Sequence, residues 1–260
     1  MSDRTGRIVA ITGGAGGIGE AAATKLAAEG WRVVVLDRNM DGARRVADLC
    51  GGTAREIDLA DRDSIEAAAS FVEREIGPCY GLVTVGALLE DPHRPEDVAP
   101  DALREILTVN VDGTFLTATA FGRAMLERKA GSIVTLGSIV GLNSTPLFAY
   151  GTSKAAVINL SRSLAVAWGR AGIRVNTICP GPTLTSALLA SYARGDRDPA
   201  ARIRQTALGR IVEPSEVADG ICFLLSDRAS AITGTELTVD CGITAAQMWN
   251  LYNGVPEARA

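Results

Sequence analysis

The chain has 260 residues, of which 47% are hydrophobic and 22% are charged, and its formal net charge is −4. This composition is typical of a soluble globular protein, and the length allows one α/β domain to bury a core without disulfides or metals. The negative net charge argues against a basic surface for nucleic acid or anionic lipid, so we expect neither a nucleic-acid partner nor a membrane.

The cysteines, the single histidine and the first residues argue against further classes. The five cysteines lie far apart and form no CxxC pair, which is typical of free thiols in a reducing compartment. His93 lies alone in a proline-rich loop, so we expect no metal site. Residues 1–7 lack the apolar segment of a signal peptide, and no apolar run is long enough for a membrane helix. We therefore expect a cytoplasmic protein.

In chain order, short β-branched runs alternate with longer amphipathic stretches, which predicts βαβ units. The predicted strands are 7–12, 32–36, 54–57, 81–85, 132–136, 174–179 and 236–239. The predicted helical stretches between them include 18–29, 64–75, 100–128, 150–170 and 216–225. Because the strands are brief and apolar, we expect helices on both faces of a parallel sheet. The fold class is therefore α/β, with a Rossmann-like doubly wound parallel sheet.

The chain shows no internal repeat, and we expect residues 1–260 to form a single dinucleotide-binding and catalytic domain. Residues 183–210 mix leucine-rich segments with Gly195, Asp196, Asp198 and Pro199. This stretch is too short for a second domain and predicts a substrate flap. Residues 244–260 form a C-terminal tail.

A glycine-rich turn follows the first predicted strand and leads into a helix. It fits a GxGxxG pattern through Gly14, Gly16 and Gly19, and a TGxxxGxG pattern through Gly13, Gly17 and Gly19. Glycines allow a tight turn close to a pyrophosphate, and the helix N-terminus offers free N–H groups. Such a turn alone is a weak signal, because glycine-rich turns without a ligand also occur.

Asp37 ends the second predicted strand, 18 residues beyond Gly19. A carboxylate there can accept hydrogen bonds from the adenosine ribose and would repel a 2′-phosphate. The adjacent Arg38 can in principle hold a phosphate, but no basic residue lies inside the glycine turn. The sequence therefore predicts NAD as the cofactor, in preference to NADP.

Tyr150 and Lys154 are spaced i,i+4 at the start of a predicted helix, so their side chains share one face. A neighbouring ammonium and an oxidised nicotinamide both favour the phenolate, so we expect the pKa of Tyr150 to lie below that of free tyrosine. Only three of the 26 basic residues are lysines, which makes a chance pair less frequent and suggests that a compact ammonium is needed.

With the glycine turn, the acid at a strand end and Tyr-x3-Lys in this order, the chain resembles the short-chain dehydrogenase/reductase family from residue 12 to about residue 242. The resemblance implies that Tyr150 is the general acid/base and that Lys154 lowers its pKa and binds the nicotinamide ribose. It implies that Ser138 binds the substrate oxygen and that Asn110 holds a water of the proton relay. The cofactor contacts that it implies are Gly13, Gly17, Ile18, Gly19, Asp37, Asp58, Leu59, Gly86, Tyr150, Lys154, Thr183 and Thr185.

The chain departs from the family pattern at two places. Thr84, Val85, Gly86 and Ala87 stand where the family has Asn-Asn-Ala-Gly, which puts stability and cofactor affinity in question. Asp240-Cys-Gly242 replaces Asp-Gly-Gly, which puts the geometry of that turn in question.

The leading interpretation is an NAD-dependent short-chain alcohol dehydrogenase or carbonyl reductase that moves a hydride between NAD(H) and a secondary alcohol or ketone. A non-catalytic NAD(H)-sensing protein of the same fold is an alternative, motivated by the departure at residues 84–87. A methyltransferase can have a similar glycine turn and strand-end acid, but the Tyr150/Lys154 pair has no purpose there.

The substrate and the assembly are predicted only in outline. Candidate pocket residues are mostly apolar and suggest a partly hydrophobic alcohol or ketone; they are Leu88, Ile139, Val140, Leu147, Leu184, Leu188 and Leu189. The stretches 100–128 and 150–170 carry apolar residues on more than one face: Leu103, Ile106, Leu107, Phe115, Phe121, Val157, Leu160, Leu164 and Trp168. One sheet face cannot bury them all, and related proteins pair these helices, so we expect a homotetramer.

Overall fold

The computed structural model describes residues 6–196 and 198–256. Within them, seven parallel strands form one sheet in the order β3-β2-β1-β4-β5-β6-β7. The strands are β1 (Ile8–Thr12), β2 (Arg32–Asp37), β3 (Thr53–Glu56), β4 (Cys79–Thr84), β5 (Gly131–Leu136), β6 (Ile173–Pro180) and β7 (Glu236–Val239). They confirm all the predicted strands, with small shifts at the ends. The predictions for residues 1–5, 197 and 257–260 concern positions outside the described part of the chain.

The described residues also form ten α-helices. They are α1 (Gly17–Ala28), α2 (Met40–Cys50), α3 (Arg62–Phe71), α4 (Pro100–Leu107), α5 (Gly113–Arg128), α6 (Phe148–Gly169), α7 (Ser186–Ala193), α8 (Pro199–Ile203), α9 (Pro214–Leu225) and α10 (Ile243–Ala246). The predicted helical stretch at 100–128 contains a π-helical turn, η3 (Thr108–Asp112), between α4 and α5. Helix α2 has no counterpart among the helices named from the sequence.

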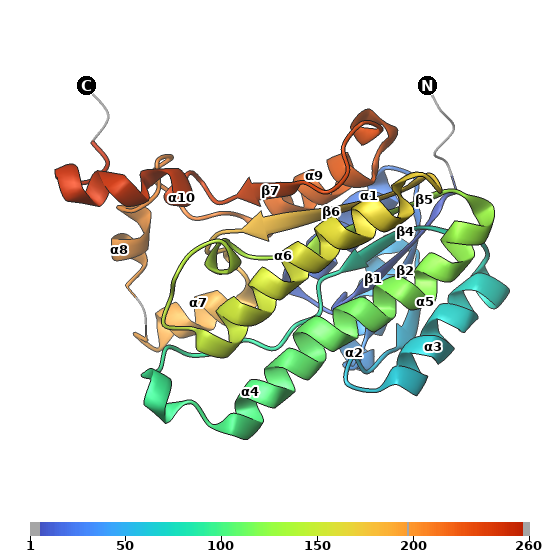
Figure 1. Ribbon diagram of the computed structural model, residues 1–260, viewed down its shortest axis with the longest axis horizontal. Coiled ribbons are helices and arrows are strands. Elements are labelled where there is room, and N and C mark those ends of the chain that lie inside the picture. The colour runs from blue at the N-terminus through green and yellow to red at the C-terminus, as the bar shows by residue number, and fades with distance from the viewer. Residues whose placement is uncertain (1–5, 197, 257–260) are drawn as a thin grey trace.

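Helices cover both faces of the sheet, which confirms the doubly wound fold (Figure 1). Alternate residues of a strand point to opposite faces. In β1, Val9 and Ile11 pack in one core with α1, α2 and α9, whereas Ile8 and Ala10 pack in a second core with α3, α5 and α6. Both cores consist of buried apolar side chains, so the sheet is a rigid platform for the loops at its carboxyl edge.

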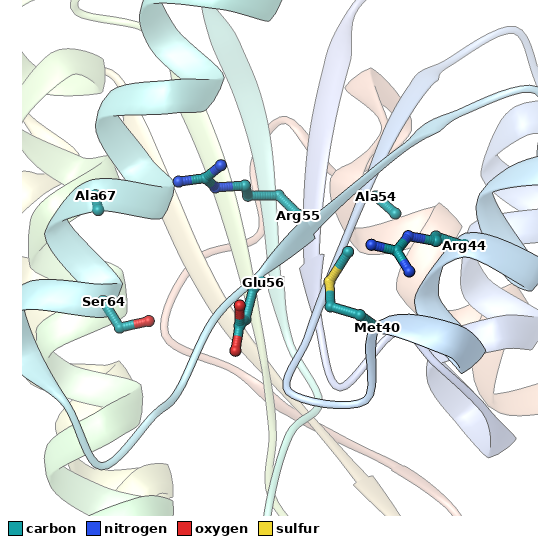
Figure 2. Close-up of a pocket in the computed structure, with 7 residues that line it drawn as sticks. All are labelled: Met40, Arg44, Ala54, Arg55, Glu56, Ser64 and Ala67. Atoms are coloured by element: carbon teal, nitrogen blue, oxygen red, sulfur yellow. The ribbon is translucent and has the colours of Figure 1, made fainter.

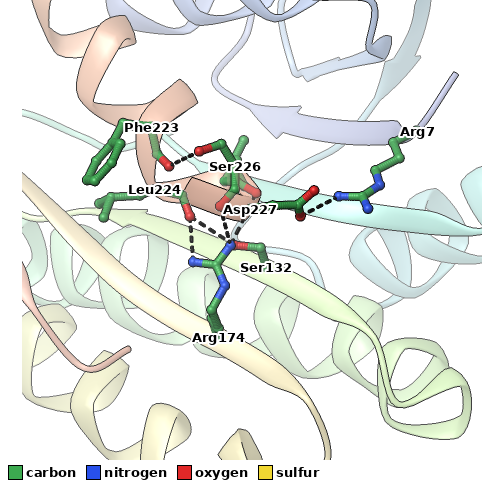
Figure 3. A network of polar contacts seen from close by, with 8 residues as sticks. Arg7, Ser132, Arg174, Phe223, Leu224, Ser226 and Asp227 are labelled. Carbon is green, nitrogen blue, oxygen red and sulfur yellow. Dashed lines mark hydrogen bonds and ion pairs between the residues drawn. The ribbon is translucent and has the colours of Figure 1, made fainter. Parts of the chain in front are cut away.

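At the opposite edge of the sheet, Arg174 ties the end of α9 to β6 (Figure 3). Its guanidinium donates hydrogen bonds of 2.6, 3.2 and 3.2 Å to the carbonyl oxygens of Leu224, Leu225 and Ser226. The last carbonyl groups of a helix lack intrahelical partners, and a cation at the C-terminus also interacts favourably with the negative end of the helix dipole. Because α9 packs against α1, this contact supports the helix that follows the glycine turn.

Candidate active site

The predicted site residues gather at the carboxyl edge of the sheet. The strand order reverses between β1 and β4, since β1 lies between β2 and β4 while β5 to β7 continue on the other side. A crevice at such a reversal is where open α/β sheets bind ligands. The glycine turn follows β1, Asp37 ends β2, Gly86 follows β4 and Ser138 follows β5. Residues far apart in the sequence therefore meet at one edge.

The glycine turn adopts a backbone that needs glycine. Gly13 and Gly17 have φ values of +66° and +55°, in the left-handed region. A Cβ on Gly19 would lie 2.1 Å from the carbonyl oxygen of Gly13, so the turn folds tightly onto the first turn of α1. Ile18 is half-buried and packs against the core beside it.

This turn fits the pyrophosphate of a dinucleotide. Gly16 is the N-cap of α1, and no side chain caps the helix. Space in front of Gly16 is open, because a Cβ there would have no neighbour within 4 Å. A Cβ on Gly13 would lie 2.5 Å from the backbone nitrogen of Gly86, so the two backbones are in contact. We call this contact surface, formed by Gly13 and the segment 84–87, the cofactor floor. The helix N-terminus can therefore receive an anionic group, whose negative charge its dipole favours.

Asp37 is held against the glycine turn by its carboxylate. Its Oδ2 accepts a 3.0 Å hydrogen bond from the backbone N–H of Ala15, and its Oδ1 accepts one of 2.9 Å from Asn39. Asn39 in turn caps α2 by accepting from the N–H of Gly42 at 3.1 Å. Asp37 is half-buried, whereas Arg38 is exposed. The carboxylate thus has a fixed place beside the turn, where an adenosine ribose would lie.

Asp58 and Leu59 lie in the next loop, after β3. The Asp58 N–H donates to Ser64 Oγ at 2.9 Å, and Asp58 Oδ1 accepts from the N–H of Ala60 at 2.9 Å. A Cβ on Gly86 would lie 2.7 Å from Leu59 Cδ1, so Leu59 packs on the floor formed by Gly13 and Gly86. The structure therefore brings these residues to the same side of the crevice as Asp37.

Tyr150 and Lys154 lie in the first turns of α6 and meet Ser138, which follows β5. Lys154 is 2% exposed, its Nζ lies 5.5 Å from the centre of the Tyr150 ring, and it donates a 2.8 Å hydrogen bond to the carbonyl oxygen of Leu136. Ser138 shares a side-chain hydrogen bond with Tyr150, and its Oγ also accepts from the N–H of Val140 at 3.3 Å. A phenol, a hydroxyl and an ammonium thus form one cluster.

The expected direction of the Tyr150 pKa is wrong for the protein without cofactor. Although Tyr150 is partly exposed, burial raises its pKa to about 12, and this outweighs the hydrogen bond with Ser138, which lowers it. Burial lowers the pKa of Lys154 to about 8. Both shifts have the same physical cause, because a low-dielectric surrounding disfavours the charged form of either group. The burial of Tyr150 results from tertiary packing, whereas the spacing of Tyr150 and Lys154 shows only that the ammonium is near.

Asn110 lies in the π-helical turn η3, and its side chain is fully engaged. Its amide accepts from the N–H of Leu88 at 2.8 Å and donates to the carbonyl oxygen of Leu88 and to Ser153 Oγ, both at 3.0 Å. Its own carbonyl oxygen accepts from Thr114 Oγ1 at 2.7 Å. These bonds tie the loop after β4 to α6, and the predicted role of Asn110 in holding a water stays a prediction.

Thr183 and Thr185 start the predicted flap. Thr183 is buried and donates to the carbonyl oxygen of Gly181 at 2.9 Å. Thr185 caps α7 by accepting from the N–H of Leu188 at 3.4 Å. A Cβ on Gly17 would lie 3.3 Å from Thr185 Cγ2, so the flap begins directly against the glycine turn.

Two hollows lie among the described residues. One, of about 870 Å³, opens between the loop after β4 and the flap, and its lining consists of Asp91, Pro92, Arg194, Asp196, Asp198, Ala201, Arg202 and Gln205. The other, of about 330 Å³, lies at the edge strand β3 between α2 and α3, and its lining consists of Met40, Arg44, Ala54, Arg55, Glu56, Ser64 and Ala67 (Figure 2). The first borders the flap, and the second contains none of the predicted cofactor contacts.

Comparisons with known proteins agree with this geometry. A family model described as Enoyl-(Acyl carrier protein) reductase matches residues 13–244. The chain is 36% identical to 2-(S)-hydroxypropyl-CoM dehydrogenase 3 of Xanthobacter autotrophicus, over 94% of this chain and 100% of the relative. It is 38% identical to galactitol 2-dehydrogenase (L-tagatose-forming) of Cereibacter sphaeroides, over 92% and 95% of the two chains. A solved structure titled ribose-5-phosphate isomerase from Brucella melitensis has a TM-score of 0.95 and 38% identity, over 97% of this chain and 98% of that chain.

The chain belongs to the short-chain dehydrogenase/reductase family. This confirms the resemblance and supports oxidoreductase activity. Membership of this family rules out the interpretation of the chain as a methyltransferase. No helix among the described residues is long and apolar enough to cross a membrane, and these residues contain no group of three or more His, Cys, Asp or Glu side chains that could hold a metal ion.

The two departures from the family pattern have different consequences. The floor at residues 84–87 stays attached to β1, because the N–H of Val85 donates to the carbonyl oxygen of Thr12 at 3.1 Å. The hydroxyl of Thr84 is buried and has no hydrogen-bond partner among the described residues. At the second departure, Cys241 has a φ of +52°, where glycine is favoured. Asp240 holds this turn by accepting from the N–H groups of Gly242 and Thr244 at 2.8 and 2.9 Å.

One residue at the site was missed by sequence reasoning. Glu90 Oε2 accepts a 2.8 Å hydrogen bond from the backbone N–H of Tyr150. The two residues are 60 positions apart, and no motif connects them, so only the folded chain reveals the contact.

Proposed function

We propose that this member of the short-chain dehydrogenase/reductase family is an NAD(H)-dependent oxidoreductase that interconverts a secondary alcohol and a ketone. The observation that carries the proposal is the cluster of Tyr150, Ser138 and Lys154 at the carboxyl edge of the sheet. It lies on the same edge as a glycine turn whose helix N-terminus is free of any side-chain cap. A proton-transfer group and a dinucleotide cradle therefore face one crevice.

In alcohol oxidation, the Tyr150 phenolate takes the proton from the substrate hydroxyl, and in ketone reduction the phenol returns it. Ser138 donates a hydrogen bond to the substrate oxygen and fixes its distance from Tyr150. Lys154 lies under the phenol and favours the phenolate by its positive charge. A bound nicotinamide would supply the acceptor or donor of the hydride. Proton transfer of this kind by a positioned side chain typically accelerates a reaction by ~10²–10⁴-fold.

The cofactor is proposed to lie along the crevice, with its pyrophosphate on Gly13, Gly17, Ile18 and Gly19. Asp37 would accept hydrogen bonds from the adenosine ribose, which supports NAD over NADP. Asp58, Leu59 and Gly86 would contact the adenine side. Tyr150 and Lys154 would contact the nicotinamide ribose, and Thr183 and Thr185 its carboxamide.

The substrate is proposed to enter between the loop after β4 and the flap at 183–210. Six of the seven candidate pocket residues are half-buried, and Leu189 is exposed. These side chains favour a partly hydrophobic alcohol or ketone near the reacting carbon, whereas the 870 Å³ hollow farther out is lined by charged groups. We retain the single-domain organisation, because the described strands form one sheet and the proposed site residues gather at its carboxyl edge.

A homotetramer in the cytoplasm remains our proposal for the assembly and location. Of the nine apolar residues in the two helical stretches, Ile106, Phe121, Val157 and Leu164 are buried within one chain, whereas Phe115 is 42% exposed. On α6, Val166 is 84% exposed. Apolar side chains left exposed on two neighbouring long helices support pairing of these helices between subunits.

The direct test is a screen of secondary alcohols with NAD and of ketones with NADH, followed by the absorbance of NADH. We expect turnover of at least one substrate by the wild-type protein and a rate lower by ~10²–10⁴-fold in Tyr150→Phe. Binding of NAD and NADH to the same protein is measured in parallel by calorimetry. A protein that binds NAD(H) but turns over no alcohol or ketone would support the alternative of a non-catalytic NAD(H) sensor.

A further inference from the structure

The first turn of α6 begins without a capping residue of its own. Leu147 is the N-cap, and its side chain makes no capping hydrogen bond. The first four N–H groups of a helix have no intrahelical acceptor, and Tyr150 is the third residue of α6. Its N–H therefore needs an acceptor from elsewhere, and Glu90 Oε2 is that acceptor at 2.8 Å.

The carbonyl oxygen of Tyr150 accepts a hydrogen bond from a side chain of the same helix, which is itself bound by Asn110 of another element. Ser153 Oγ donates to the Tyr150 carbonyl oxygen at 2.7 Å, and the same Oγ accepts from Asn110 Nδ2 at 3.0 Å. Both polar groups of the Tyr150 backbone are thus linked to residues outside α6, the N–H directly to Glu90 and the carbonyl oxygen through Ser153 to Asn110. Such a clamp restricts the rotation and slide of the turn that carries the phenol.

Glu90 is itself fixed by the loop in which it lies. Two residues before it, Leu88 exchanges two hydrogen bonds with Asn110, at 2.8 and 3.0 Å. Three residues after it, the N–H of His93 donates to the carbonyl oxygen of Pro146 at 3.2 Å, just before α6. The loop after β4 therefore runs alongside the start of α6 and is attached at both ends (Figure 1).

We infer that Glu90 is a positioning residue for Tyr150, a role that rests on the proposed function. Its carboxylate takes the place of the missing N-cap and sets the phenol at a fixed distance from Ser138 and from the substrate oxygen. A negative group at a helix N-terminus is also stabilised by the helix dipole. Because the same loop continues from the floor at Gly86, Glu90 couples the position of Tyr150 to that of the cofactor floor.

The test compares Glu90→Ala, which removes the acceptor, with Glu90→Gln, which keeps an oxygen in the same place. The matched control is Glu73→Ala, because Glu73 Oε1 accepts from the N–H of Cys79 at 3.2 Å at the amino end of β4, the opposite edge of the sheet. We expect Glu90→Ala to lower kcat by about 10–100-fold, as small displacements of reacting groups do, with KM and the Kd of NAD within about twofold. Glu90→Gln should keep most of the activity, and Glu73→Ala should lower Tm without lowering kcat.

A second readout does not depend on activity. Hydrogen exchange of the Tyr150 amide should be faster in Glu90→Ala than in wild type and in Glu90→Gln, because the amide loses its acceptor. The inference is overturned by an unchanged exchange rate, by a Glu90→Ala kcat within twofold of wild type while Tyr150→Phe is inactive, or by equal losses in both Glu90 variants. If the wild-type protein turns over no substrate, the proposed function fails, and the exchange rates alone decide the role of Glu90.

Discussion

Lys154 Nζ lies 5.5 Å from the centre of the Tyr150 ring, and its hydrogen bond is made to the carbonyl oxygen of Leu136. The ammonium is therefore buried under the phenol with a backbone carbonyl as its partner. Without cofactor, the pKa of Tyr150 is raised to about 12 and that of Lys154 is lowered to about 8, because burial disfavours both charges. The site therefore contains two neighbouring ionisable groups whose charged forms are both disfavoured by burial.

Tyr150→Phe should remove turnover and leave cofactor binding nearly intact, since only the hydroxyl is lost. We expect kcat to fall by ~10²–10⁴-fold and the Kd of NAD to change by less than about twofold. Steady-state kinetics and calorimetry on the same preparation provide the measurement. Activity within a few-fold of wild type would remove Tyr150 from its proposed role.

Lys154→Met should make the stability of the protein less dependent on pH. Burial places the folded pKa of Lys154 at about 8, below its ordinary value of 10.5. Between these values the unfolded chain binds a proton that the folded chain does not, so this group makes unfolding less favourable as pH rises. The wild-type free energy of unfolding should therefore rise relative to that of Lys154→Met from pH 8 to pH 10, as measured by urea denaturation. A constant difference between the two proteins would contradict the lowered pKa.

Asp37→Ser should narrow the preference for NAD over NADP. The variant loses a charged acceptor for the ribose hydroxyls and the repulsion of a 2′-phosphate. Hydrogen bonds to charged groups contribute about 1.5–3 kcal/mol, so the ratio of kcat/KM for the two cofactors should fall by at least about tenfold. Arg38→Ser serves as the control, because Arg38 is exposed beside Asp37. Equal or better efficiency of the wild-type protein with NADP would refute the preference itself.

Thr84→Val should stabilise the protein, whereas Thr135→Val should destabilise it. The two threonines are neighbours in register on β4 and β5. Thr84 Oγ1 is buried without a hydrogen-bond partner among the described residues, whereas Thr135 Oγ1 bonds Ser161 at 2.7 Å and Thr177 at 2.9 Å. Removing the unpaired hydroxyl should raise the free energy of unfolding by about 1 kcal/mol, and removing the paired one should lower it by about 1–3 kcal/mol. Urea denaturation of both variants gives the comparison, and a destabilised Thr84→Val would show that its hydroxyl has a partner.

Deletion of residues 247–260 should weaken assembly or change substrate affinity. The tail exposes Met248, Trp249, Leu251 and Tyr252, whose exposed fractions lie between 52% and 76%. Such a run of exposed apolar side chains is unusual on a monomer. Light scattering should give the mass of four chains for the full protein and a lower mass or weaker association for the truncated one. A monomer at micromolar concentration would refute the tetramer, and an unaffected truncation would refute the role of the tail.

Local patterns were enough to predict the strands and the main helices. The apolar, β-branched runs predicted the central strands, because a strand buried on both faces needs apolar residues in sequence. The edge strands β3 and β7 are partly exposed and carry polar residues as well. Helix α2 was not named from the sequence, although its 11 residues are amphipathic and bury Ala43, Val46 and Ala47. Its start depends on the Asn39 side chain, which accepts from the N–H of Gly42. A side-chain cap of this kind stabilises the start of a helix.

The sequence by itself determined the order of the strands along the chain, the glycine turn, and the placement of Tyr150 and Lys154 on one helical face. These features depend on backbone conformation and on spacing within a few residues. Only the tertiary structure decided that Asn110 binds Leu88 and Ser153, that Glu90 caps the turn of Tyr150, and that Tyr150 has a raised pKa without cofactor. Hydrogen bonds between distant segments and the burial of a charge depend on which elements pack together, and the spacing of residues along the chain carries no record of that packing.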